Sequence, residues 1–139
     1  MDVGLLCEVS RPHDRDEGRL GLSCGPTLQM DTDDLQLDLN LAFEKHLGAE
    51  EAERWQLAYQ WQVKGLVARG VELGAQGFGS MGPWNGWAPA SGQQHLVGPA
   101  VFFKASAFGR PVKLDAAWLF GVGSGSPKNV VRLRLQQEF

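Results

Sequence analysis

The sequence predicts an all-β fold, an antiparallel up-and-down meander of about eight strands in a single domain over residues 1–139. Two observations support this prediction. Eight segments alternate apolar and polar residues with the two-residue period of a β-strand. The connections between them are alternately long and short along the whole chain, as expected when successive strands run up and down and their connections lie at opposite ends.

The first two predicted strands cover residues 2–10 and 19–30, and the long connection SRPHDRDEG joins them. Each strand carries one cysteine, Cys7 and Cys24. We expect that these two residues do not face each other across the hairpin, so a disulfide is not favoured and both act as small apolar side chains. Pro26 lies inside the second strand. Proline cannot donate a hydrogen bond to a neighbouring strand, so we interpret this position as a β-bulge.

The next two strands alternate most clearly. In DLQLDLNLAFEK, residues 34–45, four leucines and Phe43 share one side, and polar residues occupy most of the other. In RWQLAYQWQVK, residues 54–64, the apolar side holds Trp55, Tyr59 and Trp61. The segment EKHLGAEEAER between them has helical spacing but too few apolar residues to dock as a helix, so we predict a long connection there.

The last four strands are predicted at 70–80, 94–105, 111–120 and 130–139. Pro99 follows a glycine within its strand, as Pro26 does, and we interpret it as a second bulge. The chain ends in VVRLRLQQEF, where Val131, Leu133, Leu135 and Phe139 share one side and Arg132 and Arg134 lie on the other.

Alternation alone leaves two orientations of these strands. In a soluble barrel or sandwich the apolar side faces inward, whereas in a transmembrane β-barrel it faces lipid and the polar side lines the lumen. Three features favour the transmembrane β-barrel, either complete or as the C-terminal part of a larger one. The apolar set is too bulky for an eight-stranded interior, and the polar side is rich in small and amide residues. In addition, the aromatic residues recur near strand ends and in long connections, as they do in interfacial belts.

This orientation defines two sets of candidate residues. The predicted interfacial aromatics are Trp55, Tyr59, Trp61 and Trp118. The lumen-facing candidates are the charged residues of the polar side, which could pair with one another or line a weakly selective path. They are Glu8, Arg19, Asp38, Glu44, Lys64, Glu72, Lys104, Lys113, Asp115, Arg132 and Arg134.

Composition and motifs exclude several other classes of function. A net charge of −3 gives no indication of nucleic-acid binding, and no apolar run of about 18 residues is present to form a transmembrane helix. PHDRDE has no diagnostic metal-ligand spacing, and GVGSGSPK lacks the spacing of a phosphate-binding loop. No nucleophile elbow, paired carboxylate or Cys/His cluster appears. We therefore predict no catalytic residues, no metal, no cofactor and no enzymatic activity; a lipid-modifying barrel enzyme would rest on size alone.

The segments GAQGFGSMGPWNGWAP, HLVGPAVFFK, LDAAWLFGVGSGSP and VVRLRLQQEF together resemble the C-terminal part of a family of Gram-negative outer-membrane β-barrel proteins, described as porin-like or transporter-like. DVGLLCEVSRP and LNLAFEKHLG are similar to its middle strands, so the resemblance covers nearly all of the chain. It implies an outer-membrane location, with membrane lipid and the barrel-assembly machinery as partners. It also implies that Phe139 is the terminal assembly signal.

This family begins with a cleavable signal and further strands, whereas the present sequence starts inside a strand. We therefore expect an N-terminally truncated version of a barrel with more than eight strands. If the chain is complete, its first strand must close onto its last, leaving a plugged interior.

The sequence thus predicts a passive porin-like conduit or a structural barrel for small polar solutes, gated if at all by the Gly- and Trp-rich loop 81–93. The alternative is a soluble up-and-down β-barrel that binds an apolar small ligand. The solute and the oligomeric state are left open.

Overall fold

The computed structural model describes residues 1–10, 20–47, 54–107 and 109–137. These residues form one eight-stranded antiparallel sheet in which the strands are arranged in sequence order, which confirms the predicted meander. The strands are β1 (Asp2–Ser10), β2 (Leu20–Asp31), β3 (Leu35–Leu47), β4 (Gln56–Ala68), β5 (Val71–Pro83), β6 (Gln94–Ala107), β7 (Arg110–Gly121) and β8 (Asn129–Gln137). No helix in the described ranges is long and apolar enough to cross a membrane.

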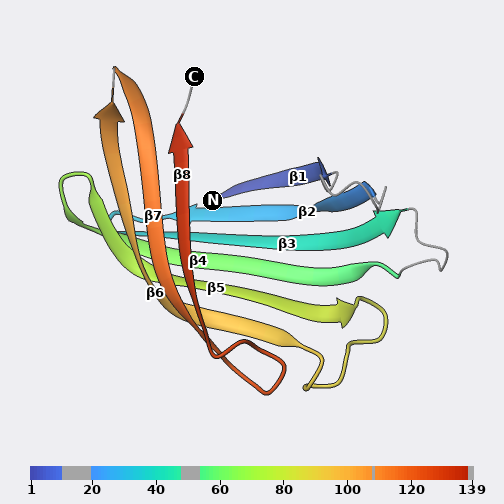
Figure 1. The fold of residues 1–139 in the computed structure, drawn as a ribbon. Helices are drawn as coiled ribbons and strands as arrows, with labels where there is room; N and C mark the ends of the chain where they lie inside the picture. The colour runs from blue at the N-terminus through green and yellow to red at the C-terminus, as the bar shows by residue number, and fades with distance from the viewer. Residues whose placement is uncertain (11–19, 48–53, 108, 138–139) are drawn as a thin grey trace.

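The sheet curls into a half-barrel (Figure 1). Strands β1 to β4 form a broad layer, and β6 to β8 bend away from it and rise across it. Each strand is hydrogen-bonded to its neighbours in sequence, and β1 and β8 form the two outer edges of the sheet. Closure of the first strand onto the last, expected for a complete eight-stranded barrel, is therefore absent from the described part of the chain.

The connections differ in length at the two ends of the sheet. Residues 32–34 and 69–70 make short connections at the end where β8 finishes, whereas the longer described connections, 84–93 and 122–128, lie at the other end. These two ends are called the short-turn end and the long-loop end below. In one short turn, Gly70 has a φ of 78°, a conformation that residues with a side chain rarely adopt.

The apolar rows of the strands face outward, on the convex side of the curl. On β8, Val131, Leu133 and Leu135 are 69%, 71% and 70% exposed. The opposite face is concave, because Arg132 of β8 reaches Gln76 of β5, three strands away, and Gln76 is only 1% exposed. A small apolar cluster also lies on this concave face, on β6 and β7. Its buried members are Ala100, Phe102, Ala117 and Leu119, with Phe78, Leu96 and Val130 packed against them.

The structure contradicts the expectation for the two cysteines. Cys7 and Cys24 lie directly opposite each other in the β1–β2 hairpin, with a Cα–Cα distance of 4.2 Å, and they form a disulfide. The prediction was wrong because it rested on a hairpin register. A long connection between two strands does not fix their register, so the sequence alone could not show whether Cys7 lies opposite Cys24. The bond lies on the outward face, since Cys7 shares the parity of Val3, Leu5 and Val9.

The interpretation of both prolines as bulges was also wrong. Pairing between β2 and β3 is interrupted at Gly25 and Pro26, but the register on either side of the interruption is the same. The β6–β7 pair is interrupted in the same way at Gly98 and Pro99. No extra residue is inserted, so each site is a gap in the ladder, caused by the missing proline N–H. The register shifts that do occur lie between β4 and β5, next to Ala58 and Ala68.

Candidate functional site

The strand register places every described lumen-facing candidate on the concave face. These residues are Glu8, Asp38, Glu44, Lys64, Glu72, Lys104, Lys113, Asp115, Arg132 and Arg134. Arg19 lies outside the described residues, as do Phe139 and the charged residues of PHDRDE. The candidates do not form one cluster. Seven of them form two ion-pair groups near the short-turn end and a chain of polar side chains across the middle. Glu8 and Glu44 line a separate hollow, and Lys113 lies beside the ion-pair groups.

The first ion-pair group is centred on Glu72 at the start of β5. Its carboxylate lies 3.2 Å from Lys64 Nζ on β4 and 3.0 Å from Lys104 Nζ on β6. The Lys64 and Glu72 side chains are only 10% and 12% exposed, whereas that of Lys104 is 49% exposed. Lys64 Nζ also lies 5.3 Å from the centre of the Phe102 ring, in the range of a cation–π contact. One buried carboxylate thus neutralises two cations from its two neighbouring strands.

The second ion-pair group joins the last two strands. Arg134 Nε of β8 lies 3.0 Å from an Asp115 carboxylate oxygen of β7, and the two residues are direct cross-strand partners. The Asp115 side chain is 10% exposed and that of Arg134 is 42% exposed. Arg134 also donates a hydrogen bond of 3.0 Å to Gln136 on its own strand. The guanidinium is therefore anchored at one side and open to the hollow at the other.

A chain of polar side chains links β3 to β8 across the concave face. Gln36 and Gln62 both donate to the Asp38 carboxylate, and Gln76 donates to Gln62 over 3.4 Å. Arg132 completes the chain by donating to Gln76 over 3.3 Å. Glutamines recur because an amide both donates and accepts, which allows neighbouring strands to be linked without further charge.

Arg132 makes a second contact with β5, because its guanidinium carbon lies 4.4 Å from the centre of the Phe78 ring. Both contacts of Arg132 reach β5, so they fix β8 over the middle of the curl. The buried part of the concave face thus combines linked polar side chains with the apolar cluster beside them.

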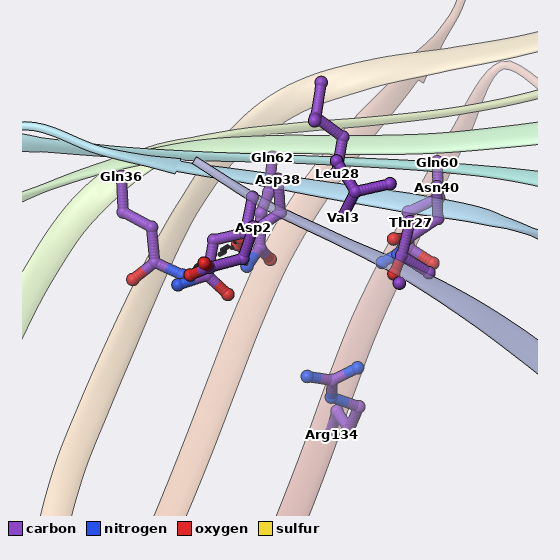
Figure 2. Close-up of a pocket in the computed structure, with 12 residues that line it drawn as sticks. Asp2, Val3, Thr27, Leu28, Gln36, Asp38, Asn40, Gln60, Gln62 and Arg134 are labelled. Atoms are coloured by element: carbon purple, nitrogen blue, oxygen red, sulfur yellow. Dashed lines mark hydrogen bonds between the residues drawn. The ribbon is translucent and has the colours of Figure 1, made fainter.

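An open hollow of about 420 Å³ lies beside this wall, over β1 to β4. Figure 2 shows that Asp2, Gln36, Asp38 and Gln62 gather on one side of it and that Arg134 points toward them from β8. Thr27, Asn40 and Gln60 add further polar groups to the lining. The hollow therefore presents carboxylates and amides opposite one guanidinium.

A smaller hollow of about 210 Å³ lies nearer the long-loop end. Glu8, Glu44 and His46 contribute to its lining from β1 and β3. No group of three or more His, Cys, Asp or Glu side chains with metal-binding geometry occurs among the residues that the structure describes.

The predicted interfacial aromatics lie on the convex face. Trp118 is 57% exposed and stacks on Phe120 with ring centres 5.5 Å apart. Trp55, just before β4 at the long-loop end, lies 5.8 Å from Lys45 Nζ. Trp61 lies in the middle of β4, away from either end of the strand.

Two glycines of β5 explain the placement of the β4 aromatics. Trp61 pairs with Gly77 and Tyr59 with Gly79, and each ring occupies the space where a Cβ of the glycine would lie. Tyr59 Oη then reaches across Gly79 to His95 Nδ1 on β6, at 2.8 Å. This Tyr59–His95 contact was not predicted. The sequence did hold a signal for this arrangement. Tyr59 and Trp61 are two residues apart in β4, as Gly77 and Gly79 are in β5, and large aromatic rings often cover glycines of a neighbouring strand.

The exposed Trp84 and Trp87 add two further aromatic rings to the connection 84–93, again at the long-loop end. No protein-family model, curated protein or solved structure matches this chain.

Proposed function

We propose that this chain is a β-barrel protein of the bacterial outer membrane, or a sector of one, whose polar concave face lines a passive path for small polar solutes. The observation that carries this proposal is the distribution of side chains between the two faces. Rows of Leu, Val, Trp and Phe cover the convex face, while Lys64, Gln76 and Asp115 are 9%, 1% and 7% exposed on the concave face. A lipid-facing exterior and a polar lumen are the arrangement expected of such barrels.

The energetics of burial support a bilayer as the surrounding medium. Transferring one Leu or Val side chain out of water is worth about 1.5–3 kcal/mol. The three apolar residues on β8 alone are each about 70% exposed. In water, these side chains would therefore contribute little of that transfer free energy to folding. The same arrangement is favourable when hydrocarbon surrounds the convex face, because the costly charged groups are then kept away from lipid.

The strand lengths are also sufficient. Strands β3, β4 and β5 have 13 residues each, which at about 3.3 Å per residue gives roughly 43 Å along a strand. With the tilt of about 40° usual in membrane barrels, such a strand rises by roughly 33 Å. The hydrocarbon core of a bilayer is about 30 Å thick.

The Cys7–Cys24 disulfide is a separate argument for the proposed location. Disulfides form in oxidising compartments, of which the bacterial periplasm is one. A chain on its way to the outer membrane passes through that compartment. Lipid and the barrel-assembly machinery would then be its partners. The proposed signal role of Phe139 rests on the resemblance alone.

Refolding in detergent tests the proposal. We expect a compact form that migrates differently on electrophoresis before and after boiling, and quenching of Trp61 and Trp118 by brominated lipid after reconstitution. Reconstituted protein should also conduct small ions across a planar bilayer. A chain that folds in buffer without detergent, with Trp118 quenched by aqueous iodide, would contradict the membrane assignment. If Trp118 and the leucine rows were instead protected from iodide in that detergent-free fold, the soluble ligand-binding barrel would be the correct alternative.

A further inference from the structure

We propose that the hollow of about 420 Å³ over β1 to β4 is a weak binding site for small zwitterionic solutes, amino acids among them. The carboxylate of the solute would bind Arg134, and its ammonium group would bind Asp38. The inference deepens the proposed function and rests on it, because it names the class of solute that the polar path would admit. It follows from how the two charges are held, from the uncharged groups beside them and from the electrostatics of the hollow.

The negative side of the hollow is formed by Asp38 of β3, with Asp2 of β1 in the same cross-strand row. Gln36 and Gln62 both donate hydrogen bonds to the Asp38 carboxylate. These amides carry no charge, so they orient the carboxylate without neutralising it. Glu72 differs, because two lysines neutralise it. Among the residues that the structure describes, no cation pairs with Asp38, so its negative charge remains available to a solute.

The positive side of the hollow is formed by Arg134 of β8. Its Nε lies 3.0 Å from an Asp115 carboxylate oxygen, and its Nη2 donates to Gln136 over 3.0 Å. These two contacts hold the guanidinium in place, while 42% of the side chain stays exposed. In Figure 2 the guanidinium points across the hollow toward the carboxylates. A guanidinium fixed in this way is preorganised to bind a carboxylate.

A second arginine keeps the charge on this side positive. Arg132 lies two residues before Arg134 on the same face of β8, and it interacts electrostatically with both Arg134 and Asp115. Two guanidinium groups therefore share one nearby carboxylate. The pairing of Arg134 with Asp115 thus fixes its position without cancelling the positive charge on this side of the hollow.

Uncharged polar groups form the third side of the hollow. Thr27, Asn40 and Gln60 are direct cross-strand neighbours on β2, β3 and β4, and all three are half-buried. Their row lies two residues, or about 7 Å, along the strands from the row of Asp38 and Gln62. Hydroxyl and amide groups both donate and accept hydrogen bonds, so they can bind the polar part of a solute that lies between the two charges.

The opposed charges select one class of solute. An anion attracted by Arg134 is repelled by Asp38 and Asp2, and a cation attracted by these carboxylates is repelled by Arg134. An uncharged solute leaves both sides without a counter-charge. A zwitterion meets an opposite charge at each end, so its orientation across the hollow is fixed. The binding has to be weak, because a solute that is held tightly does not pass on.

Calorimetric titration of the detergent-refolded protein at pH 7 tests the site, with 4-aminobutyrate as the probe. We expect a dissociation constant on the order of 1 mM, as suits a weak site. Butyrate and butylamine each keep only one of the two charges of the probe. Both should bind about tenfold more weakly or worse, because each loses one charge-assisted hydrogen-bonded contact.

Two variants and a matched control locate the binding. Arg134→Gln should weaken the binding of 4-aminobutyrate about tenfold. That change also leaves Asp115 without its ion-pair partner and can unfold the protein, so Asp38→Asn is the second variant. It keeps the shape of the side chain, and it should weaken 4-aminobutyrate by a similar factor and narrow its advantage over butyrate. The control is Lys104→Gln, which removes a cation of similar exposure from the concave face outside the hollow, and affinity should stay within about twofold.

Several results would overturn the inference. Equal binding of 4-aminobutyrate and butylamine would indicate a simple cation site, and equal binding of 4-aminobutyrate and butyrate would indicate a simple anion site. Affinity unchanged in both Arg134→Gln and Asp38→Asn would place the binding elsewhere.

Bilayer conductance separates these failures from failure of the proposed function. Protein that conducts ions but binds no 4-aminobutyrate would overturn the binding site and leave the membrane path in place. Protein that binds 4-aminobutyrate with the expected effects of the variants but never conducts would support the site and contradict the path.

Discussion

The substitution Leu133→Lys distinguishes a lipid environment from water at the convex face. Leu133 lies at the centre of β8, points outward and is 71% exposed, with Ala116 as its cross-strand partner. If this face is in water, a lysine there replaces a solvated apolar group and should change the free energy of unfolding by no more than about 0.5 kcal/mol. If this face is at mid-depth in a bilayer, the cost should be about 2–4 kcal/mol. The two predictions do not overlap.

The assay is reversible urea unfolding in lipid vesicles, followed by tryptophan fluorescence. The matched control is Gln137→Lys, on the same face of the same strand but at the short-turn end, where the cost of a lysine should be only about 0–1 kcal/mol. Leu41→Lys, at the centre of β3, repeats the test on a second strand. If Leu133→Lys and Gln137→Lys destabilised the protein equally, the argument from the two faces would fail.

Three further outcomes follow from the described contacts. Reducing the Cys7–Cys24 bond should lower the stability by about 3 kcal/mol, because the bond closes a loop with a sequence separation of 17 residues, measured as the shift of the urea midpoint with and without reductant. Gly79→Ala should cost about 1–3 kcal/mol in the same assay, because the new methyl group would displace the Tyr59 ring. Glu72→Gln should cost about 1–3 kcal/mol, since it leaves a nearly buried lysine without its counter-ion, and should shift bilayer conductance toward anions.

Each of these outcomes has its own control. Gly86→Ala places a methyl group where no atom lies within 4 Å, so its midpoint should not move. Lys104→Gln removes only the more exposed partner of Glu72, so its cost should stay below about 1 kcal/mol. The cysteine argument fails if reductant leaves the midpoint unchanged. If Gly79→Ala and Gly86→Ala lowered the stability equally, the contact with the Tyr59 ring would not be the cause. The same holds for the ion pair if Glu72→Gln and Lys104→Gln lowered the stability equally.

The strands and their faces could be predicted from the sequence because both follow from local alternation. The predicted strand at 2–10 matches β1, and the other predicted boundaries lie within a few residues of those observed. Parity within a strand places Asp38 and Arg134 on the polar side of their strands, but it does not say which side is concave; that choice rested on the bulk of the apolar set and the positions of the aromatic residues. The long and short connections were evident from the same local alternation.

Features that depend on how strands meet could not be predicted in the same way. The Cys7–Cys24 bond depends on the register of a hairpin with a long connection, which local sequence does not set. Phe102 and Leu119 share the polar parity, and they are buried only because the sheet curls over them. The unpaired edges of β1 and β8 likewise depend on curvature accumulated over all eight strands.

The sequential order of the strands has a consequence for how the protein folds. Every pairing in the sheet joins a strand to its neighbour in the chain, so each step of assembly closes only a short segment and costs little chain entropy. Topologies dominated by such local contacts fold quickly. The sheet can therefore grow one hairpin at a time, from any of its turns.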